Sequence, residues 1–424
     1  MEHQREQERL TGRISRTATT TTAALVLLTA CGASTPEQQA APIDRVVIEE
    51  GVFPEAEDAL LRSSFRLGAA MTADPEANQV TSPLSALYAL SMLRAGAGTT
   101  TAAEMDAVLG LPAEHHEAMN ALLARVEGFD GDPGGVDEDN PPEKPLLHLA
   151  NAVFVPEDGT TGERFLATLA RNYGAGVYPV DFADPATAAR IDGWVSRETG
   201  GRIGKAPLEV DAGTTLSLLN TVYFAAAWDE PFDPSGTFDE EFMLADGSRV
   251  DVPMMHGTRT VRYIEADGWT GIDLPYGEGF SLRLLLPAEG SPPQWTEQEL
   301  LDMAELLDAA EDVRVDVALP TWDHEFEQDL LESLAAIGLR ESFGPEADFR
   351  AIQPGTVVGG AAQVANITVA EKGTIAAAVT QVVMMTSAPM PPEVSISFDR
   401  PFGYQIIHED TGLPLFMGTV ADPR

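Results

Sequence analysis

Cysteine is nearly absent from this chain, because Cys31 is the only one in 424 residues. A disulfide within the chain is therefore impossible, and a disulfide-stapled scaffold is excluded. The sole cysteine also stands beside an N-terminal leader, whereas a cysteine nucleophile would need a place inside the folded domain. Stability has to come from a hydrophobic core, and a hydrophobic fraction of 44% is ample for one.

Lysine is scarce as well, since Lys144, Lys205 and Lys372 are the only three. None of them has a serine three residues before it, which excludes an S-x-x-K acyl enzyme. The chain has 26 basic against 67 acidic residues, and a net charge of -41 cannot neutralise phosphates in quantity. We therefore expect no nucleic-acid partner, and we expect a soluble monomer that repels its own copies.

Enzyme motifs are missing too. Neither G-x-S-x-G nor H-E-x-x-H occurs in the sequence. Only His115 and His116 are adjacent among seven histidines, and neighbours on a helix point in different directions, so no zinc site is predicted. The pair Gly96-x-Gly98 lacks the preceding strand and the further glycine or lysine of a phosphate loop. The sequence predicts neither an enzyme nor a bound metal or cofactor.

Residues 1–30 have the pattern of an export signal. Four arginines between positions 5 and 16 precede an apolar run over residues 23–30, which is too short to span a bilayer. The run ends in Leu28-Thr29-Ala30-Cys31, which resembles a bacterial lipobox and implies that Cys31 is lipidated. Residues 31–52 are then a flexible tether, and residues 53–424 the folded domain. We expect an extracytoplasmic lipoprotein, anchored at the cell surface or the periplasmic face; a plain secretory signal, and hence a secreted protein, is the alternative.

Periodicity and capping residues predict the regular elements. Ser82 is expected to cap a buried helix that starts at Pro83 and stops at Gly96. The acidic stretch from Gly128 to Pro145 predicts a solvated surface loop, because the glutamate that closes an EF-hand calcium loop is missing at the proper spacing. Further helices are predicted over residues 56–71, 165–173, 186–199, 296–310 and 326–338, and strands over residues 149–155, 216–224 and 313–320, with a pair of strands in 271–287.

The most unusual stretch runs from Glu371 to Val394. Between residues 374 and 388 it has no charge, proline or glycine and consists mainly of β-branched and small residues, which favours a strand. Three prolines, at 389, 391 and 392, then remove backbone donors and favour an extended, exposed connection. One interpretation is a buried central strand followed by a proline-rich turn. The other is a loop that is able to become a strand.

Several motifs resemble those of the serpin family. The start of the stretch is similar to the hinge of an inhibitory serpin's reactive-centre loop, through Glu371, Gly373, Thr374, Ala376, Ala377 and Ala378. The helix that begins Ser82-Pro83-x-Ser85, the strand around Asn220 and the C-terminal segments 399–404 and 415–420 are also serpin-like. The similarity extends over residues 53–423.

The resemblance implies an α/β fold with a large, mainly antiparallel sheet, additional sheets, flanking helices and an exposed reactive-centre loop. It implies an inhibitor that is not an enzyme and that acts as a suicide substrate of a serine protease. The protease attacks the loop and becomes an acyl-enzyme, and the segment from Thr374 onward then inserts into the sheet as a new strand. A lipid-anchored carrier or binding module on the same scaffold is the alternative function.

The composition of the loop favours the inhibitor. Insertion buries alternate residues, which are uncharged and small enough: Thr374, Ala376, Ala378, Thr380, Val382 and Met384. Family spacing places the cleaved bond at Ser387-Ala388, and Met385-Thr386 is an alternative. Ala388-Pro389 is less suitable, because proline after the bond hinders most serine proteases. The loop lacks arginine and lysine, so we expect elastase-like or subtilisin-like targets and no inhibition of trypsin.

The resemblance also implies a region of the sheet that must open for insertion, made by Ser82, Ser85, Asn220 and Gln363. Gln363 stands where serpins usually have a histidine, but an amide both donates and accepts hydrogen bonds, so the network can persist. Trp194 is expected near the top of the main sheet, where the loop first inserts, although a tryptophan at this position also suits a core.

Overall fold

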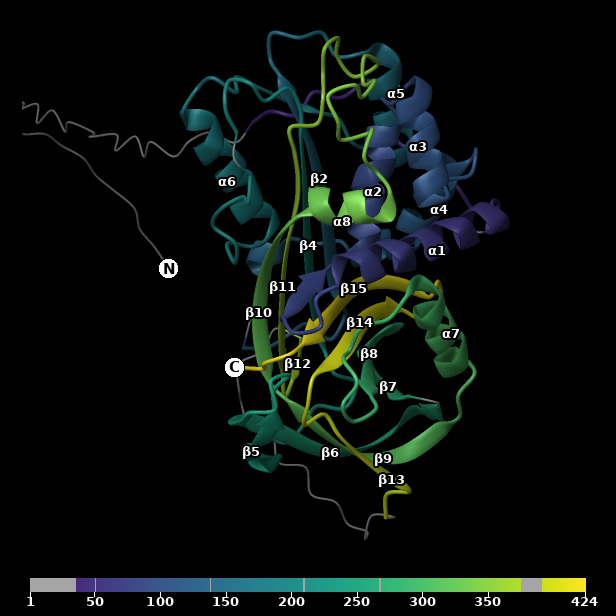
Figure 1. Cartoon of the computed structure of the whole chain (residues 1–424), viewed down its shortest axis with the longest axis vertical. Helices are drawn as coiled ribbons and strands as arrows, with labels where there is room; N and C mark the ends of the chain where they lie inside the picture. Colours follow the sequence, from purple (N-terminus) through teal and green to yellow (C-terminus); the bar gives the residue numbers. More distant parts are fainter. Residues whose placement is uncertain (1–35, 50, 138, 209, 267, 375–390) are drawn as a thin grey trace, which may run out of the picture. The chain divides into compact units, whose positions relative to one another are not determined.

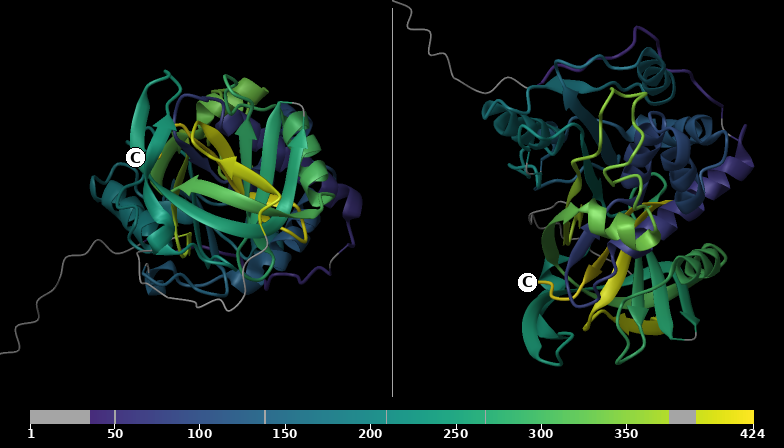
Figure 2. Two further views of the ribbon diagram at one scale, coloured as in Figure 1. Left: turned by 90° about the horizontal axis from the view of Figure 1, so that it is seen from below. Right: turned by 45° about the horizontal axis from the view of Figure 1, so that its top comes forward.

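Two β-sheets form the framework of the folded part (Figure 1). The computed structural model describes residues 36–49, 51–137, 139–208, 210–266, 268–374 and 391–424. In the described residues, the first sheet has the strand order β10-β11-β12-β4-β2-β3 and the second the order β1-β15-β14-β8-β7-β6-β9-β13, with β5 paired to β6. Seen from below, the strands of the second sheet lie at changing angles, as the right-handed twist of β-strands produces (Figure 2).

The strands have the following bounds: β1 Gln79–Thr81, β2 Leu146–Pro156, β3 Tyr178–Val180, β4 Ser217–Ala227, β5 Thr237–Met243, β6 Arg249–Ala266, β7 Trp269–Pro275, β8 Phe280–Pro287, β9 Asp312–Pro320, β10 Trp322–Asp329, β11 Gly360–Ala370, β12 Gly373–Thr374, β13 Val394–Ser397, β14 Phe402–His408 and β15 Leu413–Val420. Most neighbours are antiparallel, but β11 and β4, β2 and β3, and β9 and β13 pair in parallel. The predicted α/β fold with a large, mainly antiparallel sheet is confirmed.

The helices are α1 Pro54–Met71, α2 Pro83–Arg94, α3 Thr99–Leu109, α4 His115–Val126, α5 Glu163–Tyr173, α6 Ala186–Glu198, α7 Glu297–Asp308 and α8 Leu330–Ile337. Helix α2 packs against β2, β4 and β15, and almost all of its residues are buried. Helix α6 lies on the other side of the first sheet (Figure 1). None of the helices in the described residues is both long and apolar enough to cross a membrane.

The predicted N-cap of α2 is confirmed, and two further helix ends follow the same local rules. Ser82 is the N-cap of α2, and its side chain accepts a hydrogen bond from the backbone N–H of Ser85. Helix α5 ends at Gly174, whose φ of 61° is the left-handed conformation that glycine adopts without strain. Thr296 and Glu299 form a capping box at the start of α7. These ends were predictable because each depends on residues next to one another in sequence.

The helix predicted over residues 326–338 starts too early. Residues 326–329 belong to β10, which pairs with β11 from Trp322 to Asp329, and the helix begins only at Leu330. Asp329 is the N-cap, since its side chain accepts from the N–H of Leu331 at 2.9 Å. A ladder of hydrogen bonds to β11 therefore determines the conformation here, and it overrides the local preference.

The acidic stretch between α4 and β2 forms two short 3₁₀ turns, η1 Glu127–Phe129 and η2 Pro133–Gly135. Most of its residues are exposed, as expected of a surface loop. The described residues contain no group of three or more histidine, cysteine, aspartate or glutamate side chains arranged to hold a metal ion.

Candidate functional site

The first sheet is split at one end by the two residues of β12. Gly373 and Thr374 pair with Ala370 and Val369 of β11 on one side, and with Ala227 and Ala226 of β4 on the other. Further along, β11 and β4 pair directly and in parallel, from Gly360 opposite Ser217 to Ala365 opposite Val222. The boundary between β11 and β4, called the seam below, is therefore open by one strand at one end and closed at the other (Figure 1).

The turn that leads into β12 is held by backbone hydrogen bonds. The carbonyl of Glu371 accepts from the N–H of Phe232 at 2.7 Å, and the carbonyl of Lys372 accepts from the N–H of Trp228 at 2.9 Å. The Glu371 carboxylate also accepts from the hydroxyl of Thr237 at 2.9 Å. Gly373 has to be glycine, because a Cβ there would lie 2.1 Å from the Ala226 carbonyl oxygen. We call residues 371–374 the hinge turn.

Two aromatic residues pack beside the hinge turn. The indole N–H of Trp228 donates to the carbonyl of Ala370 at 2.8 Å, and its rings stack on Tyr276 at 4.4 Å between centroids, with 7° between the planes. The hydroxyls of Tyr276 and Thr374 are hydrogen-bonded, and Thr374 is only 1% exposed. Burial raises the pKa of the Tyr276 hydroxyl, so it stays protonated. Gly373 and Thr374, the two residues of β12, are therefore already buried and paired on both sides.

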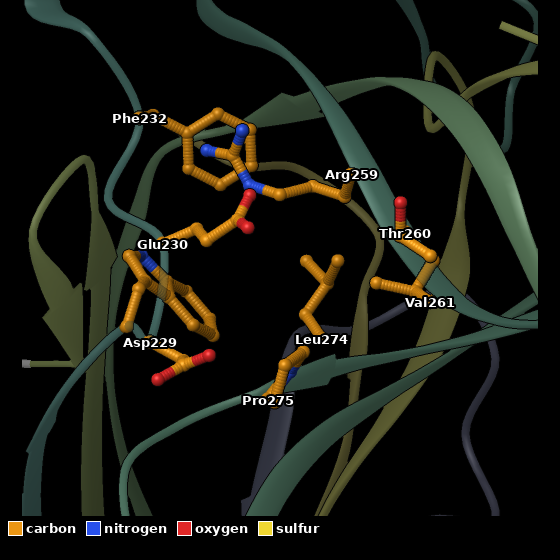
Figure 3. A pocket seen from close by; sticks show the side chains of 9 residues that line it. Asp229, Glu230, Phe232, Arg259, Thr260, Val261, Leu274 and Pro275 are labelled. Atoms are coloured by element: carbon orange, nitrogen blue, oxygen red, sulfur yellow. The ribbon is translucent and has the colours of Figure 1, made fainter.

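A small hollow lies beside the hinge turn, between the segment after β4 and strands β6 and β7 (Figure 3). The guanidinium of Arg259 lies over the ring of Phe232 at 4.4 Å and donates to the carbonyl of Pro231 at 2.9 Å. Burial lowers the pKa of Arg259 below its ordinary value. The hollow has a volume of about 40 Å³, which suits one or two waters and not an organic ligand. Its walls support the segment that holds the hinge turn.

The closed end of the seam contains a network of buried amides and hydroxyls. The side-chain oxygen of Gln363 accepts from the Thr81 hydroxyl at 2.6 Å and the Ser82 N–H at 2.7 Å. Its side-chain nitrogen donates to the Ser82 carbonyl at 2.9 Å and the Asn220 side-chain oxygen at 2.6 Å. Asn220 donates in turn to Ser85 and, at 2.6 Å, to Asn151. Gln363 therefore makes hydrogen bonds both to the Thr81–Ser82 segment and to Asn220.

This network joins the two sides of the seam. Gln363 of β11 and Asn220 of β4 are register partners, so their hydrogen bond crosses between the parallel strands. Both are 1% exposed or less, and opening the seam would leave buried polar atoms in need of new partners. The structure thus brings together Ser82, Ser85, Asn220 and Gln363, and the opening of this region stays a prediction. The contributions of Thr81 and Asn151 were missed, although an asparagine in an otherwise apolar strand was a usable signal.

Trp194 does not lie where the sequence prediction placed it. It is in α6, with its rings 6.1 Å from Phe154 and 6.2 Å from Tyr178 between centroids. The tryptophan beside the hinge turn is Trp228, one residue beyond the end of β4. Trp194 belongs to the apolar face of an amphipathic helix, together with Ile191 and Val195. Its role in the structure is therefore a core role.

Helix α6 bridges the seam on the outer face of the sheet. Its residues Ile191, Trp194 and Val195 form one apolar cluster with side chains from three strands: Phe154 of β2, Leu219 of β4, and Ala362 and Val364 of β11. Separating β11 from β4 by the width of a strand, about 4.8 Å, must therefore rearrange contacts of this helix. The remaining predicted site residues, namely Cys31, Ala376, Ala377, Ala378, Met385, Thr386, Ser387 and Ala388, lie outside the described residues.

Comparison with known proteins gives a consistent result. A family model described as Serpin (serine protease inhibitor) matches residues 59–423. Serpin-Z1C of Triticum aestivum is 33% identical over 396 residues, which cover 85% of this chain and 95% of the relative. Among solved structures, the thermophilic serpin tengpin in its native state has a TM-score of 0.78 and 26% identity, covering 92% of this chain and 100% of tengpin. Human thyroxine-binding globulin complexed with thyroxine has a TM-score of 0.74 and 25% identity, covering 87% and 98%.

The family model thus spans the split sheet, the hinge turn and the buried network, and the relative and the structures align over most of their own lengths. The resemblance predicted from the sequence is confirmed, and the chain belongs to the serpin family.

Proposed function

We propose that this serpin inhibits serine proteases by inserting its reactive-centre loop into the first sheet. Serpins are for the most part protease inhibitors rather than catalysts. The loop-insertion mechanism and the class of target protease are our proposal for this chain. The observation that carries the proposal is the position of Gly373 and Thr374, already paired on both sides between β11 and β4. A strand that continued from Thr374 in the same register would lie along the seam, between β11 and β4.

The register of β12 indicates where such a strand would lie. Each further residue steps back by one on β11 and on β4, so position 380 would fall opposite Gln363 and Asn220. Thr380 would then enter the polar network and could replace part of the hydrogen bonding that the opening of the seam disrupts. Ala376 and Ala378 would share the inner face with it, and small side chains suit that face.

The energetics favour insertion once the loop is cut. The direct pairing of β11 with β4 extends over six residue pairs and is parallel, whereas the inserted strand would be antiparallel to both neighbours. Antiparallel pairs are slightly more stable per residue, and one interface is replaced by two. On the order of ten new hydrogen bonds, at about 0.5–1.5 kcal/mol net each, supplies roughly 10 kcal/mol before side-chain burial is added.

Cleavage at Ser387-Ala388, or at Met385-Thr386, would free the strand. The absence of arginine and lysine from residues 373–390 supports proteases with a preference for small or apolar residues, of elastase or subtilisin type. Trypsin is expected to form no complex. The partner in the trapped state is then the serine protease itself, joined to the inhibitor by an acyl bond.

The test is to incubate the soluble domain from about residue 33 with subtilisin, elastase and trypsin, followed by denaturing gels and mass spectrometry. A complex that survives SDS, a C-terminal fragment that starts at Ala388, and higher thermal stability after cleavage are the expected results. Clean cleavage without a complex and without a gain in thermal stability would contradict the proposal.

We propose in addition that the chain is exported and anchored in a membrane by a lipid on Cys31. The lipobox-like sequence Leu28-Thr29-Ala30-Cys31 supports this location, and the net charge of -41 supports a monomer. Membrane fractionation of the full chain and of a Cys31→Ala variant tests the anchor. The variant should leave the membrane fraction, whereas equal retention of both would exclude lipidation at this residue.

A carrier function has one structural observation in its favour. A groove of about 500 Å³ lies between α1 and α7, with an apolar part made by Leu61, Phe65, Leu301 and Ala304. The similar structure of human thyroxine-binding globulin is a complex with thyroxine. Equilibrium binding of thyroxine, with and without a Leu301→Glu substitution in the groove, separates this function from inhibition, which the substitution should leave unchanged.

A further inference from the structure

The acidic insertion, residues 128–145, contacts the hinge turn directly. The ammonium of Lys372 donates to the backbone carbonyl of Asp139 at 2.8 Å and to the side-chain oxygen of Asn140 at 3.1 Å. The carbonyl of Pro142 accepts from the N–H of Ala227 at 2.9 Å, and Ala227 is the β4 residue paired with Gly373. A loop expected to be merely solvated therefore reaches both the hinge turn and the strand beside it.

The acceptors for Lys372 are arranged by the insertion itself. The Asp137 carboxylate accepts from the N–H of Asp139 and from the side-chain amide of Asn140, each at 3.0 Å. The N–H of Asn140 also bonds the carbonyl of Asp137 at 3.0 Å. The Asn140 side chain and the Asp139 N–H lower the pKa of Asp137, so its charge persists. Lys372 thus meets two oxygens that a local turn holds in position.

The other end of the insertion is attached to β2 and α6. Asp130 and Glu198 accept from the two ring nitrogens of His148, at 2.7 Å and 2.9 Å. The backbone of Pro133 lies so close to Gly200 that a Cβ there would be 2.7 Å from the Pro133 oxygen. The insertion is therefore fixed to the β4–β2 side of the seam, whereas Lys372 lies two residues beyond the end of β11. Their contact joins the two sides of the seam at its open end.

We propose that Lys372 and the turn of Asp137, Asp139 and Asn140 form a clasp that keeps the hinge turn in place, so that insertion starts from a strand already two residues long. The inference rests on the proposed function, for which Lys372 is a positioning residue. The pairing of Ala370 with Gly373 is the one that an inserted strand would keep, so the clasp can stay closed throughout. It removes the cost of ordering the first residues, which is the unfavourable step in starting a strand.

The clasp should act on the competition that follows attack by the protease. The acyl-enzyme is either hydrolysed, which releases active protease, or trapped because the loop inserts first. A slower start of insertion increases the share that is hydrolysed, so more inhibitor is consumed for each protease molecule trapped. The rate at which the protease first attacks the loop does not depend on the clasp.

The experiment compares Lys372→Met with Lys205→Met, a matched substitution of an exposed lysine in the loop after α6. Lys372→Met should raise the number of inhibitor molecules consumed per trapped subtilisin by about threefold, as expected for the loss of two exposed hydrogen bonds of small net strength. Asp137→Ala should do the same, and the double variant should add little to either single one. Lys205→Met should match the wild type. An unchanged stoichiometry in Lys372→Met, or an equal rise in Lys205→Met, would overturn the clasp.

Hydrogen exchange separates failure of the clasp from failure of the proposed function. The amides of Gly373 and Thr374 should exchange several-fold faster in Lys372→Met than in the wild type, without any protease present. If the wild type traps no protease, the inhibitor proposal fails, and the exchange rates still decide whether the clasp exists. If the wild type traps protease and the exchange rates are equal, the clasp alone is wrong.

Discussion

The two ends of the seam between β11 and β4 are built from different interactions. The hinge end is held by backbone hydrogen bonds from Phe232 and Trp228 and by stacked aromatic rings, all of which lie outside the path of a new strand. The closed end is held by side-chain amides, and the hydrogen bond from Gln363 to Asn220 crosses the path itself. One end can therefore remain unchanged during insertion, while the other has to break. This difference supports the proposal that insertion starts at the hinge end and proceeds toward the network.

The largest effect is expected from a charge at the hinge end. In Thr374→Arg, a cation would replace a hydroxyl that is 1% exposed and bonded to Tyr276, and burying an unpaired charge costs several kcal/mol. Insertion should stop at its first residue and the protein should become a plain substrate. Denaturing gels with subtilisin should show cleaved inhibitor and no complex. Ser395→Arg, at an exposed residue of β13, is the control. A complex at wild-type yield in Thr374→Arg would refute the role of the hinge.

The next largest effect is expected at the closed end. Gln363→Leu leaves the Ser82 N–H and the Asn220 side-chain oxygen without their partner, at a cost of roughly 2–4 kcal/mol of unfolding free energy. Urea denaturation of the intact protein measures this loss. After cleavage and insertion the two sides of the network would be separated, so the same substitution should cost the cleaved form less. Gln363→His, which keeps a donor and an acceptor, should be milder in both forms, and equal losses in intact and cleaved Gln363→Leu would contradict the idea that insertion passes through the network.

A smaller effect distinguishes the two tryptophans. Trp228→Phe removes the indole N–H that bonds the Ala370 carbonyl at 2.8 Å, and the loss of one such bond is worth about 1 kcal/mol. Amide exchange at Gly373 and Thr374 should accelerate by about fivefold. Trp194→Phe is the matched control, because Trp194 packs in α6 and should change global stability without a specific change at the hinge. Faster hinge exchange in Trp194→Phe alone would contradict this comparison and would give Trp194 the role at the hinge.

The sequence predicted the parts of the site that depend on composition and local order. Ser82 before Pro83 is a capping pattern, and Asn220 is a polar residue in an apolar strand, so both attract attention without a structure. The contact of Lys372 with Asn140 connects residues 232 positions apart, and no periodicity reveals it. The prediction for Trp194 is wrong because two tryptophans stand in serpin-like motifs, and the one beside the hinge turn is Trp228. Both tryptophans are buried, and only their contacts in the fold separate them: Trp228 bonds the Ala370 carbonyl, whereas Trp194 packs against Phe154 and Tyr178.

The smallest effect concerns the attachment of the insertion at His148, and it depends on pH. Burial disfavours the imidazolium, but the carboxylates of Glu198 and Asp130 outweigh burial and raise the pKa of His148 above its ordinary value. A raised pKa in the folded state means that the stabilisation is fully present below about pH 6.5, the ordinary value for histidine, and is lost as the pH rises through the folded pKa.

His148→Gln should therefore be less stable than the wild type at pH 5.5, by about 1 kcal/mol or less, and nearly equal to it at pH 8.5. Urea denaturation at the two pH values measures the loss of unfolding free energy. Glu198→Gln, which removes one of the two carboxylates, should also lose more stability at pH 5.5 than at pH 8.5. A deficit that grows as the pH rises would show that the neutral imidazole is the stabilising form. If hinge exchange at Gly373 in His148→Gln follows the same pH dependence, the insertion transmits the state of its attachment to the hinge end, and if it does not, the clasp at Lys372 holds independently of His148.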